Sequence, residues 1–204
     1  MAFVLAAPLA MAQAEKAPEA PADAPEDGEE RSVFALQGHQ LGDQTLALNA
    51  GVMVPLFFQE FDGSVHDTNL TVGGMGELQW SAYVSPNIRI GLDIGGTFAR
   101  SPNDRTLFLM PITVKAAWVF NVSRFEFPVS LGAGINIVRY REWSHIDFIL
   151  KPGVGGYWRY DSNWSFGLNL AWWLDFQSAT GDQPDNQARM GNFLMISPGV
   201  FYNF

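Results

Sequence analysis

Residues 196–204 read ISPGVFYNF, and larger apolar side chains alternate along this stretch with mostly small or polar ones. One parity holds Ile196, Pro198, Val200, Tyr202 and Phe204, and the other holds Ser197, Gly199 and Asn203. Alternation with a period of two is typical of a β-strand whose two faces meet different surroundings. The stretch therefore predicts a last strand that starts near residue 190, although an ordinary edge strand ending on Phe would show the same pattern.

The same alternation recurs seven times upstream. The segments expected to form strands are 45–58, 69–84, 88–98, 108–120, 125–137, 146–160, 166–176 and about 190–204. Each is at least as long as the roughly 10 residues with which a strand crosses a bilayer. An even number of such strands predicts an all-β fold, an eight-stranded antiparallel up-and-down transmembrane β-barrel over residues 41–204.

The alternation alone does not say which face of the sheet lies inside, because a soluble lipocalin-like barrel alternates as well. The face with fewer apolar residues carries charges of both signs, which suits a lumen, whereas an apolar exterior of this size would aggregate in water. We therefore expect the apolar face to meet outer-membrane lipid. The expected lumen-facing charges are Glu77, Arg89, Asp93, Lys115, Glu126, Asp147, Lys151, Arg159 and Asp175.

These charges fall at three expected depths. Glu77, Asp93, Lys115 and Lys151 lie near mid-height, Arg89, Glu126 and Arg159 lie low, and Asp147 and Asp175 lie high. Charges at a shared depth can pair across a narrow interior, and burial without a partner is costly. The set fits two interpretations, a structural network that helps to plug the barrel and a polar path for a small solute.

The links between the predicted strands suggest an orientation. The links at 85–87, 121–124 and 161–163 are tight and are assigned to the periplasm; those at 59–68, 101–105, 141–145 and 178–189 are assigned to the extracellular side. Aromatic residues gather near both predicted ends, as expected at the two interfaces of a membrane. Trp164 and Tyr202 are examples at one end, and Phe58, Phe148 and Phe176 at the other.

Two segments precede the predicted barrel. Residues 1–14 are apolar and end in Ala12-Gln13-Ala14, which predicts a signal peptide cleaved after Ala14; because a basic start is missing, the true start is expected further upstream. A buried strand or helix is the alternative. Residues 15–40 are expected to form a disordered acidic, Ala/Pro-rich periplasmic tail, because they hold little to bury and residues 15–31 carry seven acids against two bases.

Composition excludes some functions. The chain has no cysteine, so thiolate chemistry and cysteine metal sites are excluded, and no cofactor is expected. Its formal net charge of −9 argues against a nucleic-acid partner. The GxG pairs precede no helix, which argues against a dinucleotide or phosphate loop.

Prolines inside predicted strands each remove a hydrogen bond that lipid cannot replace. Pro55 and Pro198 fall on the first and last strands, on either side of the expected closure, and Pro111 falls within the fourth. They are candidates for a lateral opening of the wall through a bulge. Tolerated kinks are the alternative interpretation.

Histidines are candidates for catalysis and for metal binding. Only Ser144-His145 with Asp147 suggests a nucleophile, base and orienter, as a lipid A hydrolase would need at the rim. Adjacent residues of a strand point to opposite faces, however, so a polar loop without catalysis is expected and the protein is not predicted to be an enzyme. His39 and His66 are scattered, and no metal site is expected.

Over residues 41–204 the chain resembles the small eight-stranded outer-membrane barrels, above all the OmpW/OmpX-type group. The segment LGDQTLALNAGVMVPLFF, residues 41–58, also resembles the first strand of small spirochaetal outer-membrane barrels. The ending in Val200, Tyr202 and Phe204 resembles the signal by which the barrel-assembly machinery recognises its clients. These resemblances imply an outer-membrane location, and the OmpW resemblance implies passage of small hydrophobic molecules with lateral release.

Two functions follow as hypotheses. The first is a porin-like barrel that transports a small, hydrophobic solute such as a fatty acid across the outer membrane. The alternative is a non-transporting surface protein with a plugged lumen, which serves adhesion, host interaction or envelope integrity. The ionic residues expected at mid-lumen distinguish this chain from an OmpW-like apolar tunnel.

Overall fold

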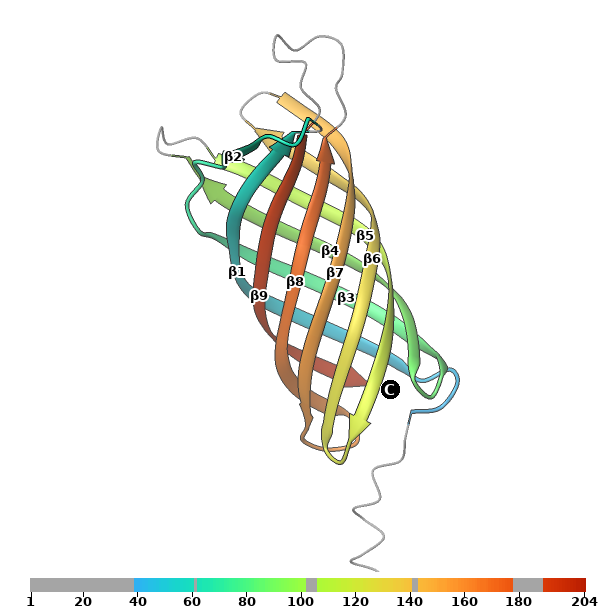
Figure 1. Ribbon diagram of the computed structural model, residues 1–204. Helices are drawn as coiled ribbons and strands as arrows, with labels where there is room; N and C mark the ends of the chain where they lie inside the picture. Colours follow the sequence, from blue (N-terminus) through green and yellow to red (C-terminus); the bar gives the residue numbers. More distant parts are fainter. Residues whose placement is uncertain (1–38, 61, 102–105, 141–142, 178–188) are drawn as a thin grey trace, which may run out of the picture. The chain divides into compact units, whose positions relative to one another are not determined.

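The structure is a computed structural model that describes residues 39–60, 62–101, 106–140, 143–177 and 189–204. The chain divides into two units, 1–35 and 36–204, and the first lies outside the described residues together with the predicted signal peptide and nearly all of the predicted tail. The strands of the second unit (Figure 1) are β1 (Gln44–Glu60), β2 (Val65–Asp67), β3 (Gly73–Ser85), β4 (Ile88–Arg100), β5 (Thr106–Val122), β6 (Phe125–Tyr140), β7 (Trp143–Arg159), β8 (Trp164–Gln177) and β9 (Arg189–Asn203).

The eight long strands form one closed antiparallel barrel. Each pairs with its neighbour in the chain, and β1 closes the sheet against β9 from Thr45↔Asn203 to Glu60↔Arg189. The predicted fold class is therefore confirmed. Hydrogen bonds of 2.9 Å in both directions between the backbones of Gln44 and Phe204 hold the last residue in the closure.

Several details differ from the prediction, and one is that β3 begins at Gly73 and not at residue 69. The short strand β2, which the alternation did not reveal, pairs with the end of β1 from Phe57↔Asp67 to Gln59↔Val65. Strands β6 and β7 also reach further than expected, so that the link between them is residues 141–142 instead of 141–145. In both hairpins the strand ends are set by hydrogen bonding between neighbouring strands, which the alternation of apolar residues does not reveal.

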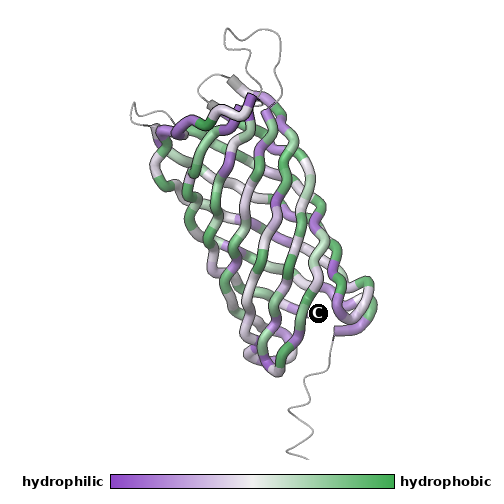
Figure 2. Tube along the Cα trace, in the orientation of Figure 1, coloured by the Kyte–Doolittle hydropathy of each residue, from purple (hydrophilic) through white to green (hydrophobic). Residues whose placement is uncertain are grey.

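The two faces of the barrel differ as the alternation predicts. On β4, Ile90, Leu92 and Ile94 are about half exposed on the outside, while Arg89 and Asp93 between them are buried inside. Figure 2 shows the same alternation of hydrophobic and hydrophilic residues along the other strands. Within the described residues no helix is long and apolar enough to span a membrane.

A bulge in β1 corrects one predicted face. The register with β9 shifts between Pro55 and Phe57, so the parity of the strand reverses there. Strict alternation over 45–58 would place Phe58 on the outer face with Leu46 and Leu48, but it pairs with Gly191 and packs against the buried core. Because a bulge inserts one extra residue, every side chain beyond it changes face.

Candidate functional site

The interior of the barrel is the candidate site, and its two ends differ. We call the end with the tight turns at 86–87, 123–124 and 160–163 the turn end, and the end where 61–72, 101–105, 141–142 and 178–188 join the strands the mouth end. All nine charged residues expected in the lumen point inward. Eight are buried, and Lys115 keeps 19% of its side chain exposed.

Four of these charges form a cluster at mid-height. The Lys151 ammonium pairs with the carboxylate of Glu77 and lies 3.6 Å from that of Asp93, and Lys115 lies 3.6 Å from Asp93 as well. Gln79 donates a further hydrogen bond to Glu77. The strand register brings them together, because Asp93 lies opposite Gln79 and Lys151 opposite Gly132, which in turn faces Lys115. This pairing makes the burial of four charges tolerable.

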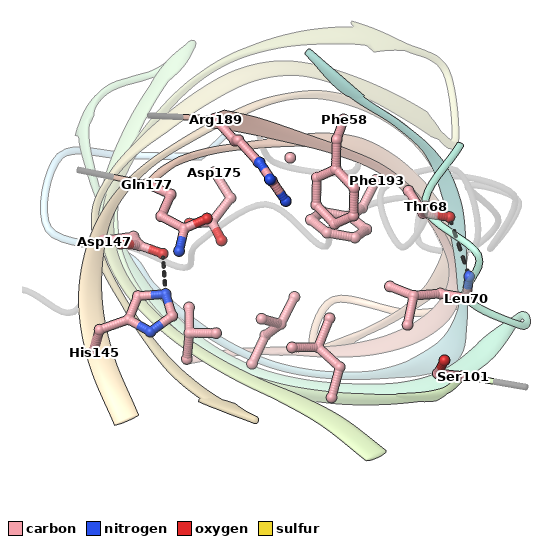
Figure 3. Close-up of a pocket in the computed structure, with 14 residues that line it drawn as sticks. Phe58, Thr68, Leu70, Ser101, His145, Asp147, Asp175, Gln177, Arg189 and Phe193 are labelled. Atoms are coloured by element: carbon pink, nitrogen blue, oxygen red, sulfur yellow. Dashed lines mark hydrogen bonds and ion pairs between the residues drawn. The ribbon is translucent and has the colours of Figure 1, made fainter. Parts of the chain in front are cut away.

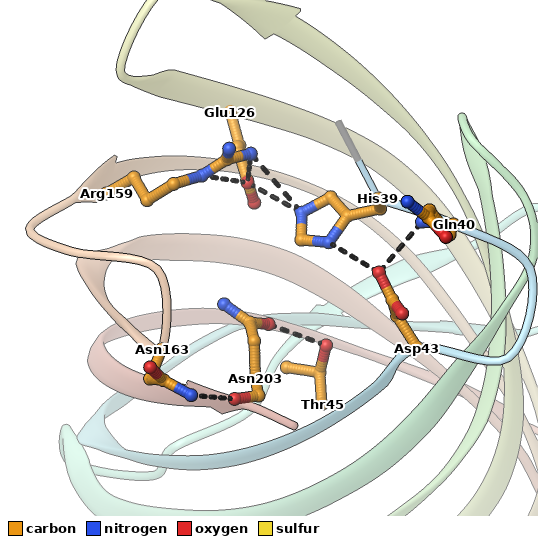
Figure 4. A network of polar contacts seen from close by, with 8 residues as sticks. All are labelled: His39, Gln40, Asp43, Thr45, Glu126, Arg159, Asn163 and Asn203. Atoms are coloured by element: carbon orange, nitrogen blue, oxygen red, sulfur yellow. Dashed lines mark hydrogen bonds and ion pairs between the residues drawn. The ribbon is translucent and has the colours of Figure 1, made fainter. Parts of the chain in front are cut away.

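A second cluster closes the turn end (Figure 4). Arg159 pairs with Glu126, and the Nε2 atom of His39 lies 2.8 Å from the same carboxylate. The His39 ring also stacks on Tyr83 at 4.0 Å between centroids and 10° between planes, and its Nδ1 atom lies 3.9 Å from Asp43. His39 was predicted to belong to the disordered tail over residues 15–40, and this role was not predicted; its position just ahead of the first strand is the only signal in the sequence.

Arg89 and two aromatic rings fill the space between these clusters. The Arg89 guanidinium lies 5.9 Å from the ring centroids of both Tyr83 and Phe201, and the Phe201 ring lies 4.1 Å from that of Tyr157. Tyr157 donates a hydrogen bond to Asn169. The turn-end half of the lumen is thus filled by paired charges and rings.

Above the mid-height cluster lies an apolar layer. Its members come from β1, β3, β4, β5, β6, β7, β8 and β9 and are Met53, Met75, Ala99, Leu109, Val138, Ile149, Trp173, Phe193 and Met195. The largest, Trp173, is fully buried, and Lys151 lies 4.9 Å from the centroid of its ring. The layer spans the lumen and separates the mid-height cluster of Glu77, Asp93, Lys115 and Lys151 from the mouth end.

The empty space in the lumen is unevenly divided. A pocket of about 340 Å³ opens at the mouth end, whereas the cavities described further down measure about 20 and 10 Å³. A space of that size holds about one water molecule. The pocket therefore ends on the apolar layer, two of whose members, Leu109 and Phe193, line it, and the two spaces described below it are water-sized.

The pocket has one polar and one apolar side (Figure 3). His145, Asp147, Asp175, Gln177 and Arg189 gather on one side, and Phe58, Leu70 and Phe193 lie on the other. The remaining lining residues are Thr68, Ser101, Leu107, Leu109, Val138 and Gly191. Phe58 was missed as a pocket residue because the bulge that turns it inward leaves no signature in the apolar pattern.

His145 and its neighbours do not form a catalytic triad. The Nε2 atom of His145 lies 3.0 Å from Asp147, inside the pocket, whereas the side chain of Ser144 is exposed on the outer face. The two side chains are separated because adjacent residues of a strand point to opposite faces of the sheet, as predicted. No group of three or more His, Asp or Glu residues in the described part of the chain is arranged to hold a metal ion.

The three prolines expected to allow a lateral opening, Pro55, Pro111 and Pro198, lie beside irregular pairing. Pro55 precedes the register shift in β1, and the β1–β9 ladder passes from Asn49↔Gly199 directly to Val52↔Ile196 beside Pro198. On the other side of the barrel, the β4–β5 ladder likewise passes from Ile94↔Ile112 to Thr97↔Leu109 beside Pro111. Gaps of the same kind lie beside Pro128 in the β6–β7 ladder and beside Pro152 in the β7–β8 ladder, so among these proline sites the seam is distinguished by the register shift after Pro55.

Comparison with solved structures identifies the class. The fold is similar to that of neisserial surface protein A, with a TM-score of 0.56 and 13% identity over 80% of this chain and 97% of that one. It is also similar to two outer-membrane proteins, AlkL and OprG from Pseudomonas aeruginosa, each with a TM-score of 0.50. AlkL is 13% identical, and the match covers 93% of this chain and 97% of AlkL. OprG is 12% identical, and the match covers 82% of this chain and 98% of OprG. At these identities the likeness shows the fold alone, an eight-stranded antiparallel barrel like those of these small outer-membrane proteins.

Sequence comparison gives the family. A family model that carries no functional description matches residues 25–202, so the chain belongs to that family of uncharacterised proteins. A Borreliella burgdorferi protein is 24% identical over 79% of this chain and 83% of its own length. A Treponema pallidum protein is 30% identical over 65% of this chain, which spans 59% of that relative. Both relatives are uncharacterised.

Proposed function

We propose that this protein is an outer-membrane barrel that takes a small, partly apolar solute into its mouth pocket and releases it sideways into the bilayer. The observation that carries the proposal is the blind pocket of about 340 Å³, which lies within the range of roughly 300–1,000 Å³ of small-molecule sites. The OmpW-like resemblance and the spirochaetal relatives agree with such a barrel. A fatty acid remains one candidate solute.

The orientation that this function needs has the mouth end outside the cell and the turn end in the periplasm. Short turns on the periplasmic side and longer links outside are the common arrangement of such barrels. The predicted tail, residues 15–40, would then be periplasmic. Recognition of Val200, Tyr202 and Phe204 by the assembly machinery belongs to the same proposal, and their side chains are exposed on the outer face.

The seam between β1 and β9 offers the route sideways. Phe58, Gly191 and Phe193 belong to these two strands and line the pocket, and the bulge at Pro55 lies in the same wall. A bulge leaves a residue unpaired and weakens the ladder locally. A solute in the pocket is therefore separated from the bilayer by an irregular part of the wall, whereas the apolar layer and the ionic cluster block the lumen.

A disulfide staple across the seam tests lateral release. Val54→Cys and Leu194→Cys replace directly opposed residues of β1 and β9, whose Cα atoms in such pairs are about 4.5–5.5 Å apart. This separation suits a disulfide. The matched control places Ile112→Cys and Ile135→Cys on β5 and β6, away from the seam. The chain has no other cysteine to interfere.

Uptake of a radiolabelled medium-chain fatty acid and of the uncharged alcohol of the same chain length is measured in Gram-negative cells that carry each variant in their outer membrane. We expect oxidation of the seam staple to abolish the protein-dependent uptake and reduction to restore it, with no effect of the control staple. Uptake that is insensitive to the seam staple contradicts lateral release. In planar bilayers the refolded protein should show no discrete openings, because the lumen is filled.

The second candidate function is a non-transporting surface protein. The filled lumen below the pocket favours it, since such a barrel needs no path at all. If cells with and without the protein take up the fatty acid and the uncharged alcohol equally, while deletion of residues 178–189 abolishes attachment to a surface partner, this alternative replaces transport.

A further inference from the structure

The polar side of the mouth pocket carries an unusual pair of acids. Asp147 on β7 and Asp175 on β8 point inward from neighbouring strands, and both line the pocket while being more than 90% buried. His145 meets one of them at 3.0 Å, and the amide of Asn136 lies beside the other. The Oδ1 atom of Asp175 has no hydrogen-bond partner among the described residues. A buried carboxylate oxygen without a donor is costly, and a ligand can supply that donor.

The other charged groups around the pocket do not neutralise this pair. Arg189 lines the pocket, but its Nε atom lies 3.8 Å from Glu60, so this cation is shared with a third acid at the rim. His66 also approaches Glu60, at 3.4 Å. Among the residues that line the pocket, two acids thus stand against one arginine and one histidine that is charged only when protonated. The excess is negative.

The apolar side of the pocket supplies the other half of a binding site. Phe58 and Phe193 meet edge to face with centroids 6.3 Å apart, and Leu70 and Leu107 pack beside them. Aromatic and aliphatic walls of this kind bind the hydrocarbon part of a ligand, and a few polar groups set its orientation. The pocket is therefore built for a molecule with one charged end and one apolar end.

We propose that the mouth pocket selects amphipathic amines: the ammonium group binds at Asp175 beside Asp147, and the apolar part lies against Phe58 and Phe193. The inference rests on the solute-binding function proposed above and specifies its substrate class. It disfavours an anionic fatty acid, whose carboxylate would have to approach the two aspartates. A metal cation fits less well, because no three suitable ligands converge in the described residues.

Three probes of equal shape test this selectivity. Phenethylamine, 2-phenylethanol and phenylacetate share a phenyl ring and differ in the charge at the other end, which is positive, neutral and negative at pH 7. Their binding is measured by titration calorimetry on the refolded full chain in phosphatidylcholine nanodiscs, with empty nanodiscs as the blank. We expect the amine to bind at least about tenfold more tightly than the alcohol, which corresponds to about 1.4 kcal/mol.

Asp175→Asn removes the charge at nearly constant volume. It should lower the affinity for phenethylamine about tenfold, to the level of the alcohol, and leave the alcohol unchanged. Asp62→Asn is the matched control, since Asp62 lies in the exposed turn after β1 and outside the pocket. Asp147→Asn provides a second variant with the same expectation, and heat-modifiable migration in gels shows that each variant is folded.

The outcomes separate the two proposals. Equal binding of all three probes, or an amine affinity that Asp175→Asn and Asp147→Asn leave intact, overturns amine selection while the solute pocket stands. Tighter binding of phenylacetate would assign the polar side to Arg189 and also overturn it. If none of the probes binds, the pocket function itself fails.

Discussion

The turn-end and mouth-end halves of the lumen are built by the same alternating strands, yet one is filled and the other is hollow. In the turn-end half, Glu126, Arg159 and His39 join in one polar contact network below the Glu77–Lys151 cluster. In the mouth-end half, Asp147 and Asp175 line a pocket of about 340 Å³. The two halves carry similar residue types, so composition does not separate them.

The difference lies in pairing and volume. Each acid of the turn-end half meets a Lys or Arg from another strand, and rings such as Tyr83 and Tyr157 occupy the space between. At the mouth end two acids adjoin each other, and the largest ring, Trp173, lies beneath them and closes the floor. An inward charge therefore helps to fill the lumen where an opposite charge pairs with it, and forms part of a binding surface where the neighbouring cation, here Arg189, contacts another acid.

The largest effect is expected when Lys151, the cation that pairs with both Glu77 and Asp93, is removed. Lys151→Ala leaves Glu77 and Asp93 buried with only the more exposed Lys115 near them. Loss of one partner of a buried ion pair costs about 3–5 kcal/mol, so we expect unfolding at much lower urea in lipid vesicles, followed by tryptophan fluorescence. Lys115→Ala is the matched control and should cost clearly less. Equal losses would mean that the cluster does not depend on Lys151.

A pair of leucines on β5 compares the packed layer with the hollow pocket directly. Leu109 is fully buried in the apolar layer, whereas Leu107, two residues away on the same face, is only partly buried at the pocket wall. We expect Leu109→Ala to lower the free energy of unfolding by about 2–5 kcal/mol. Leu107→Ala should lower it by only about 1 kcal/mol, because less surface was buried. Urea titration of both variants measures the difference; similar values would refute the distinction between layer and pocket.

His39→Ala tests whether the residue before β1 belongs to the turn-end plug. The substitution removes the stacking on Tyr83 and the contact with Glu126, and losses of this kind amount to about 1–2 kcal/mol. His66→Ala, an exposed histidine at the mouth end, is the control and should leave stability unchanged. Equal unfolding midpoints for His39→Ala and the unaltered protein would show that His39 does not stabilise the cluster formed by Glu126 and Arg159.

The smallest effect is expected at the exposed turn after β1. Hydrogen bonds from the hydroxyl and then the backbone N–H of Ser64 lower the pKa of Asp62 below its usual 3.8. A carboxyl group whose pKa is lower in the folded than in the unfolded protein stabilises the fold at pH values above its ordinary pKa. This stabilisation is lost as the pH falls through the lowered pKa of the folded state. Asp62→Asn should therefore differ slightly from the unaltered protein at pH 7 and converge with it below about pH 3.8. A difference that grows on acidification would contradict this sign.

Much of the interior was predictable because strand side chains alternate strictly. The nine lumen charges and their three depths follow from counting residues along antiparallel strands, and Lys151 meets Glu77 and Asp93 as that count requires. His39 was not predictable, because it lies outside any periodic segment. Phe58 was assigned to the wrong face, because one extra residue at Pro55 reverses the parity of the strand beyond it.

The sequence by itself determined the class of this protein: eight long alternating segments leave every strand with an apolar face that must meet lipid and a polar face that must meet a lumen. Only the tertiary structure decided whether that lumen is open. Each strand contributes its inward side chains independently, but whether two charges pair or a ring spans the gap depends on register and closure between strands far apart in the chain. The pocket at Asp175, the Trp173 floor and the His39 contact exist only once β1 has closed on β9.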